Sequence, residues 1–237
     1  GDRRPSRRAR RVVHNLAAAG AVAAALALLS ATVPAGSGST QKMSVMLAYT
    51  ALGLLTATLV LGPLRVLRHR PNPRSQDLRR DLAIWCGATG MAHVVLSFQH
   101  HLGGQVVRYF FSTDTVSLAT LRRDRFGVAN QLGLVATLIL VLLLSISNDW
   151  ALRRLGRRWK SLQRSAYALG VLSVIHTALY WSLLDRSSVL KLAVGASVVG
   201  VAVLQVSGRR VLRLGAKAPS GAARLDTGEV DVRGRRP

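Results

Sequence analysis

The chain has 237 residues, of which 49% are hydrophobic and 18% charged, and its net charge is +23. The apolar residues fall in long blocks almost free of charge, which excludes an ordinary soluble globular domain. The single cysteine, Cys86, excludes an internal disulfide and a zinc or iron–sulfur site built on thiolates. A small buried hydrophobic residue is the simplest interpretation of this cysteine.

Six apolar blocks reach, or nearly reach, the length of about 18 residues that a helix needs to cross a membrane. A segment in lipid must satisfy its own backbone hydrogen bonds, which favours helices. In chain order the blocks cover residues 16–34, 43–64, 82–107, 126–148, 165–184 and 192–208. The sequence therefore predicts an all-α, polytopic bundle of about six transmembrane helices in the cell (inner) membrane. Residues 1–11 are expected to form a basic tail, 12–214 the membrane domain and 215–237 a flexible tail.

The first block has two interpretations. Its arginine-rich start, its alanine-rich core and the small residues at 34–39 also fit a cleaved export signal. The apolar run is longer than the usual signal core of about 7 to 15 residues, which favours a retained helix.

The positive charge is sorted by side of the membrane. Of the 33 lysines and arginines, 26 lie in four segments that would share one side, namely 1–15, 64–80, 149–164 and 208–237. This asymmetry follows the positive-inside rule and predicts cytoplasmic N- and C-termini. It also argues against a nucleic-acid partner and for anionic membrane lipids as the partner of these charges.

The segment 103–125 is basic although the rule places it outside. It contains Arg108 and the group Arg122, Arg123 and Arg125. An anionic ligand or partner is one explanation, and a solvated loop held at lipid headgroups is the other.

Two histidines, His93 and His176, lie well inside apolar blocks, where an ionisable side chain indicates function. Their helices should be parallel, because two crossings separate them. His93 follows Arg80 by 13 residues and His176 follows Arg164 by 12, so both rings should lie about 18–20 Å from the inner edge. Two imidazoles at equal depth can share one metal ion.

A haem iron suits such a pair, because it needs only two axial ligands and the macrocycle supplies the other four. Gly90 and Ser173, each three residues before a histidine, leave room beside the rings. The alternative is that each histidine makes an interhelical hydrogen bond.

The other histidines have simpler interpretations. His14 and His69 lie in basic flanks and are expected to be solvated. His100 and His101 lie further out than His93, either at a mouth where an acceptor or quinone makes contact or as solvated interfacial residues.

Several motifs resemble the ferric reductase-like transmembrane family. The most specific is the run from Ser147 to Arg164 (SNDWALRRLGRRWKSLQR), followed by Tyr167 and His176. Segments 79–82 with His93, and 62–65, are similar to the starts and ends of other family helices. Within the family, the closest likeness is to the haem-binding membrane subunit of the periplasmic methionine sulfoxide reductase system.

This resemblance implies a six-helix bundle that binds b-type haem and passes electrons across the membrane, with His93 and His176 at ligand positions. Gln163 stands where the family usually has another histidine, so a second haem is not expected. A lone outer haem favours a quinol donor over a cytosolic flavin reductase. Quinone or FMN are candidate further cofactors.

The resulting hypothesis is a membrane b-type cytochrome with one haem b. Its acceptor on the outer face would be a periplasmic or extracellular reductase subunit, or ferric iron. The rival is a haem-free transporter or assembly subunit that retains the fold. Against a transporter, the sequence indicates no acidic residue inside any helix and no inverted repeat.

Overall fold

The computed structural model describes residues 6–32, 38–68, 73–112, 120–184 and 187–217. Within these ranges six helices are long and apolar enough to cross a membrane, which confirms the predicted all-α polytopic fold. They are α1 (Arg7–Ser30), α2 (Ser39–Leu67), α3 (Pro73–His100), α5 (Arg125–Ser145), α8 (Ser165–Leu183) and α9 (Ser188–Lys217). Residues 7–11, expected in the basic tail, are thus helical, and 218–237 lie outside the described residues.

Short elements connect the long helices at both ends of the bundle. Between α3 and α5 lie the 3₁₀ turn η1 (His101–Gly104), α4 (Val107–Phe110) and the antiparallel strands β1 (Phe111–Ser112) and β2 (Thr120–Leu121). Between α5 and α8 lie α6 (Asp149–Leu155) and α7 (Arg157–Gln163). The six long helices therefore carry the bundle, and the short elements mark its two faces.

Capping side chains and glycines set the helix ends. Asp124 caps α5 and Asn148 caps α6, each accepting a backbone hydrogen bond in the first turn. The predicted extension of the third helix to residue 107 is wrong. Gly103 and Gly104 have φ of 59° and 78°, a left-handed conformation that ends a helix.

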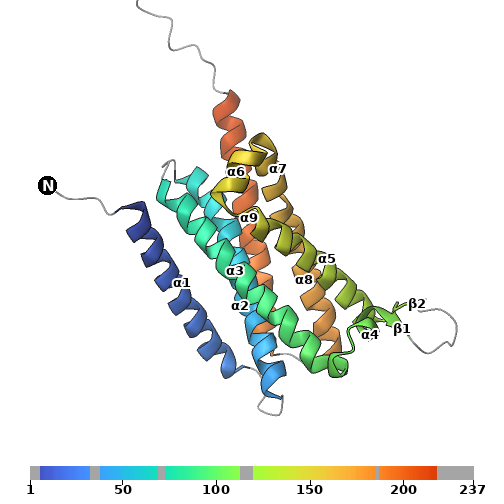
Figure 1. Ribbon diagram of the computed structural model, residues 1–237. Coiled ribbons are helices and arrows are strands. Elements are labelled where there is room, and N and C mark those ends of the chain that lie inside the picture. Colours follow the sequence, from blue (N-terminus) through green and yellow to red (C-terminus); the bar gives the residue numbers. More distant parts are fainter. Residues whose placement is uncertain (1–5, 33–37, 69–72, 113–119, 185–186, 218–237) are drawn as a thin grey trace, which may run out of the picture.

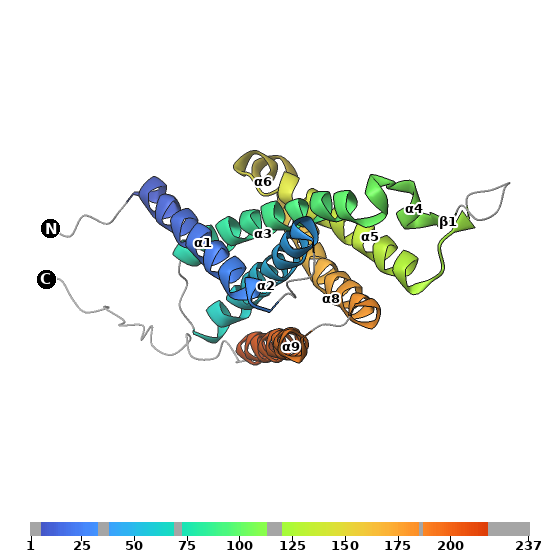
Figure 2. The same ribbon diagram turned by 90° about the horizontal axis from the view of Figure 1, so that it is seen from below.

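The long helices form a bundle with α2 near its centre. Helix α2 packs against α1, α3, α8 and α9, while α5 packs against α3 and α8. Figure 2 shows α1 and α9 at the periphery. Helices α3 and α8 run in the same direction (Figure 1), from the face with α6 and α7 to the face with α4, β1 and β2. We call these the arginine-rich face and the hairpin face.

The core is made of aliphatic side chains from the central helices. Its fully buried members are Leu54, Leu55, Leu59, Cys86, Ala136 and Leu169. The Cys86 thiol donates to the carbonyl oxygen of Ala51 at 3.3 Å. Cys86 is therefore the small buried residue that the sequence predicts.

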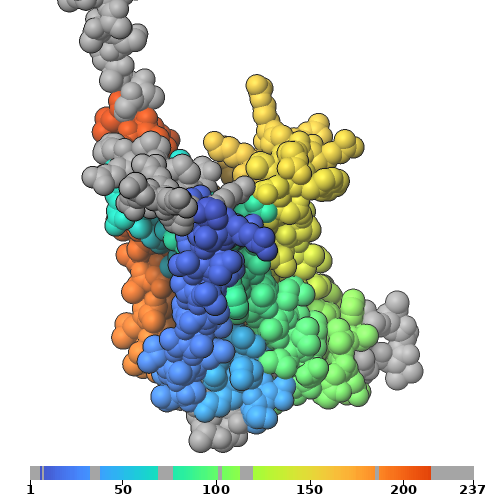
Figure 3. All heavy atoms as spheres, turned by 60° about the vertical axis from the view of Figure 1, so that its left-hand side comes forward, coloured from blue at the N-terminus to red at the C-terminus, as the bar shows by residue number. Residues whose placement is uncertain are grey.

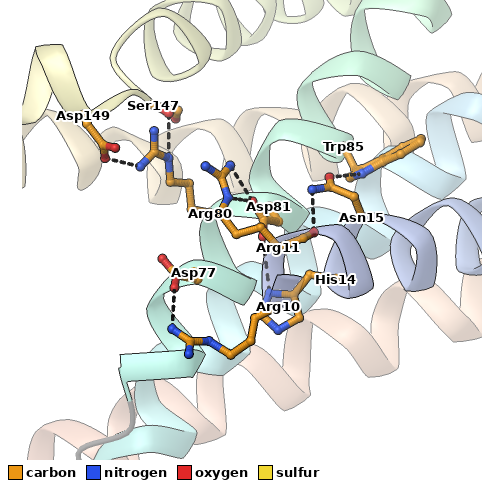
Figure 4. A network of polar contacts seen from close by, with 10 residues as sticks. All are labelled: Arg10, Arg11, His14, Asn15, Asp77, Arg80, Asp81, Trp85, Ser147 and Asp149. Carbon is orange, nitrogen blue, oxygen red and sulfur yellow. Dashed lines mark hydrogen bonds and ion pairs between the residues drawn. The ribbon is translucent and has the colours of Figure 1, made fainter. Parts of the chain in front are cut away.

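A buried carboxylate joins α1 to α3 near the arginine-rich face. The side chain of Asp81 is 1% exposed, and Arg11 donates to it through both Nε (3.1 Å) and Nη2 (2.8 Å). Nδ1 of His14 lies 3.3 Å from the other carboxylate oxygen (Figure 4). Both partners of Asp81 lie on α1, so α1 neutralises a charge that α3 buries.

These contacts overturn two expectations from the sequence. His14 is not a solvated flank residue, because it faces Asp81 and is mostly buried. An acidic residue does lie within a membrane-length helix, since the span Asp77–His100 includes Asp81. Asn15, one turn beyond Arg11 on α1, accepts a hydrogen bond of 3.0 Å from the indole of Trp85 on α3. In Figure 3, α1 lies along the side of the bundle.

The residue next to Asp81 anchors α3 on its other side. Arg80 donates to the carbonyl oxygen of Ser147 at 2.8 Å and pairs with Asp149 at the start of α6 (Figure 4). Consecutive residues of α3 thus bind α1 in one direction and the α5–α6 turn in the other.

We predict that Arg11→Ala lowers the free energy of unfolding by about 3 kcal/mol, because it leaves a buried carboxylate with His14 alone. Thermal unfolding in detergent measures the loss. Adding Asp81→Asn to Arg11→Ala should recover much of it, since an amide carries no charge to neutralise. Arg8→Ala, an exposed residue of the same helix, is the control. An Arg11→Ala protein as stable as this control would contradict the prediction.

Candidate functional site

An apolar cavity of about 240 Å³ lies between α2, α3, α5 and α8. Both His93 and His176 line it, together with Gly90 and Ser173, the small residues that precede them. The two histidines each lie seven residues before the end of their helix, at His100 and Leu183. The structure therefore brings the two predicted residues to one cavity, at a matching level on parallel helices.

The ring of His93 is held by α2. Its Nδ1 lies 2.9 Å from the carbonyl oxygen of Ser44 and 3.0 Å from the Ser44 hydroxyl. The same hydroxyl contacts Ser97 at 2.8 Å, one turn beyond His93. Because Ser44 is buried, this cluster fixes the ring against α2 within the apolar interior.

The ring of His176 is held in the same way by α5. Its Nδ1 lies 2.8 Å from the carbonyl oxygen of Ala129. A Cβ atom at Gly133 would lie 2.9 Å from two atoms of this ring, so the glycine makes room for it. Tyr180, one turn further along α8, contacts the ring at a centroid distance of 5.0 Å and donates to Asn130.

These contacts decide which nitrogen of each ring suits a metal. A carbonyl oxygen only accepts, so Nδ1 of His93 and of His176 carries the proton in these hydrogen bonds. The lone pair of each neutral imidazole is then on Nε2. Metal-binding histidines commonly have this arrangement, in which a backbone carbonyl fixes the ring and its tautomer.

The remaining candidate residues are spread over the molecule. His100 also lines the cavity, whereas His69 and the side chain of His101 lie outside the described residues. Gln163 ends α7 on the arginine-rich face and does not line the cavity. The sequence interpretation missed Ser44, Ala129 and Gly133. Ala129 acts through its backbone carbonyl, Ser44 through its carbonyl and its hydroxyl, and Gly133 through the absence of a side chain.

The donor set limits the chemistry of this site. Within the described residues, no group of three or more histidine, cysteine or acidic side chains could hold a metal ion. Two imidazoles alone suit a metal ion whose remaining coordination positions are already filled by a bound ligand that is not part of the protein.

Comparison with known proteins identifies the family. The model of the ferric reductase like transmembrane component matches residues 47–174, more than half of the chain. The chain belongs to this family. The match confirms the resemblance seen in the sequence, and with the six apolar helices it identifies a multi-pass cell-membrane protein. Helix α3 with His93 falls wholly within the matched segment, whereas α8 begins within it and His176 lies just beyond its end.

Curated relatives of this ferric reductase-like chain include proteins of Yersinia. The protein-methionine-sulfoxide reductase heme-binding subunit MsrQ of Yersinia pseudotuberculosis serotype O:1b (strain IP 31758) is 31% identical over 134 residues, which are 53% of this chain and 56% of the relative. MsrQ of Yersinia pestis (strain Pestoides F) is 31% identical over 53% of this chain and 55% of its own length. The chain thus spans about half the length of the curated relatives it matches.

We predict that Gly133→Ala lowers the free energy of unfolding by about 1–3 kcal/mol, because the new methyl group overlaps the His176 ring. Gly195→Ala on α9 is the matched control, since a Cβ there meets nothing within 4 Å. In the control, helix propensity should raise the free energy of unfolding by about 0.5–1 kcal/mol. Equal thermal stability of the two variants would show that the His176 ring is not packed on Gly133.

Proposed function

We propose that the chain is a membrane b-type cytochrome that passes electrons between the two faces of the membrane. His93 and His176 hold the iron of one haem b through Nε2. The proposal is supported above all by the position of both imidazoles, which line one apolar cavity and are oriented by backbone carbonyls. The name of the similar MsrQ proteins, heme-binding subunits of a methionine sulfoxide reductase, agrees with it.

The residues around the cavity fit this group. At Gly90 an added side chain would collide with Leu140, and at Gly133 with His176, so these glycines let α5 and the His176 ring pack closely beside the cavity. The walls are mainly apolar, with aliphatic and aromatic side chains, which suits a porphyrin. When bound, the haem supplies a one-electron couple, whose potential the axial ligands and the dry surroundings set.

The protein's own part is to orient the two histidine rings and to shield the site from water. The carbonyl oxygens of Ser44 and Ala129 hold the two rings, and their hydrogen bonds raise the basicity of each imidazole as a ligand. Tyr180 and Phe126 cover the site toward the hairpin face. No proton needs to move for a one-electron transfer through such a site.

The number of haems bears on the electron donor. Gln163, the last residue of α7, stands on the arginine-rich face where the family is expected to have a histidine. An amide is a poor ligand for haem iron. We therefore infer one haem per chain, placed toward the hairpin face. A quinol dissolved in the membrane can approach such a haem more closely than a flavin reductase docked on the arginine-rich face.

The two faces are assigned from charge. Arginines dominate the α6–α7 face, and the positive-inside rule assigns that face to the cytoplasm. The hairpin face would then deliver electrons outside, to a reductase subunit or to ferric iron. The rival function, a haem-free transporter or assembly subunit, uses the same fold without electron transfer, and Gln163 is the residue that favours it.

We predict that the purified protein shows a dithionite-reduced minus oxidised spectrum with b-type bands, and that His93→Ala and His176→Ala each abolish them. Val94→Ala and Thr177→Ala, at the adjacent positions, should keep the bands. His100→Ala should keep them too, which tests whether that cavity residue is a ligand. A wild-type protein without these bands would support the rival function.

Haem content tests the inference from Gln163. A pyridine haemochrome assay should give one haem per chain. Two haems per chain would refute both the single site and the preference for a quinol donor.

Orientation can be tested by labelling, because Cys86 is buried and the chain has no other cysteine. We expect Thr120→Cys on the hairpin face to react with a membrane-impermeant maleimide in intact cells. Ser161→Cys on α7 should react only after the membrane is permeabilised. The reverse pattern would invert the assigned orientation.

A further inference from the structure

The connection between α3 and α5 forms a small platform on the hairpin face. We define the hairpin platform as residues 106–112 and 120–126, which comprise α4, β1, β2 and the start of α5. In Figure 1 it extends sideways from the foot of the bundle, and in Figure 3 it forms a projecting corner. Its shape and its side chains together suggest a surface for a partner.

A buried tyrosine fixes the platform to the helix that carries His93. The side chain of Tyr109 is 1% exposed and donates to the carbonyl oxygen of Ser97 at 2.6 Å. Its ring packs against Phe98 and Phe126 at centroid distances of 5.1 and 5.7 Å. Since Ser97 is one turn from His93, the platform has a fixed position relative to the cavity.

The platform is also a wall of the cavity. Tyr109 and Phe110 both line it, and Phe126 packs on Tyr180 at 6.3 Å, whose ring in turn contacts His176. A protein seated on the outer side of the platform is therefore separated from the cavity by little more than one layer of aromatic rings.

Three arginines of the platform have no acidic partner within the described part of the chain. Arg122 is different, because it pairs with Asp124, donates to the carbonyl oxygen of Arg108 and lies over Phe126. The Arg122 guanidinium beside Asp124 holds the pKa of that carboxyl below its usual range, so the pair stays ionised at neutral pH. Arg108, Arg123 and Arg125 are exposed, and no described acidic residue neutralises their charge.

Exposed apolar side chains accompany these arginines. Phe111 and Leu121 are directly opposite each other across the two strands, and both are exposed, as are Val106 and Val107. Arginine mixed with aromatic and apolar side chains is typical of protein–protein interfaces. Lipid headgroups would also attract arginines, but they give no reason for the platform to form the cavity wall.

We propose, on the basis of the proposed function, that the hairpin platform docks the acidic surface of the protein that accepts electrons from this chain. Arg108, Arg123 and Arg125 steer the acceptor and orient it, and the apolar pair Phe111 and Leu121 makes the close contact. The electron then crosses the aromatic wall from the cavity to the acceptor's redox centre.

The test uses an acidic redox protein, plastocyanin, and a basic one, cytochrome c, as probes. The full chain is reduced with dithionite in phosphatidylcholine nanodiscs, and oxidation of its haem is followed by stopped flow at low salt. One electron leaves the haem and reduces Cu(II) of plastocyanin to Cu(I), or Fe(III) of cytochrome c to Fe(II). Changing all three arginines to glutamate should lower the rate of haem oxidation by plastocyanin at least about tenfold and raise the rate of haem oxidation by cytochrome c.

Two sets of variants make the result specific. Arg153→Glu, Arg154→Glu and Arg157→Glu together reverse three exposed charges on the opposite face and should leave both rates near the wild-type values. Changing the platform arginines to glutamine should slow plastocyanin less than glutamate does, and it serves as the second variant if charge reversal impairs folding. If the glutamate substitutions on the two faces changed the rates of haem oxidation equally, the proposal would be overturned.

A second measurement separates docking from haem binding. Binding of plastocyanin to the nanodiscs by biolayer interferometry needs no haem, so it tests the platform even if the chain proves to be haem-free. Changing the three platform arginines to glutamate should abolish this binding. Salt at about 0.5 M should weaken it, because surface charges are then screened. If reversal changes neither rates nor binding but removes a stabilisation by phosphatidylglycerol, the arginines bind lipid and the proposal is wrong.

Discussion

Two hydrogen bonds from imidazole to backbone carbonyl determine what this bundle can do. In lipid, a polar side chain must find its partner inside the protein, and His93 and His176 find theirs on the neighbouring helices α2 and α5. Each bond uses Nδ1 and thereby assigns the lone pair to Nε2. The same bonds join α2 to α3 and α5 to α8, so the contacts that orient the candidate ligands also connect the helices within each of these two pairs.

Charges near the arginine-rich face fix the same helix at its other end. Arg80 and Asp81 are consecutive on α3, yet they bind α5–α6 and α1 respectively. A buried ion pair adds little net stability compared with an apolar pair, but losing one partner is costly. The pair therefore acts as a constraint on position: α3 cannot rotate without exposing Asp81 to an uncompensated environment. His93, about three turns along α3, inherits that fixed orientation.

The sequence was informative wherever composition alone decides the outcome. Apolar length predicted the six membrane helices, and an ionisable residue inside an apolar block drew attention to His93 and His176. The sequence did not predict features that depend on which other residue a side chain contacts. His14 and Asp81 each look like ordinary flanking residues, and only the structure shows that Asp81 is buried and that His14, 67 positions away, lies against it. Ala129 contributes only a carbonyl oxygen, which every residue has, so no side-chain pattern could have indicated it. Ser44 adds a hydroxyl, but its contact with His93 joins residues 49 positions apart.

The position of the cavity along the bundle makes the two faces unequal. His93 and His176 each lie seven residues from the hairpin-face end of their helix, or about 10.5 Å along the axis. Toward the opposite face their helices continue for longer, and the buried core there includes Leu59 and, at the edge of the cavity, Leu169. Because electron transfer falls steeply with distance, a single centre at this level exchanges electrons readily with the hairpin face and poorly with the arginine-rich face. Under the proposed function, one centre so placed suits the exit of electrons, and a donor within the membrane would supply them. That asymmetry connects Gln163, which stands where the family resemblance leads one to expect a ligand near one face, with the arginines of the hairpin platform, the proposed docking surface on the other face.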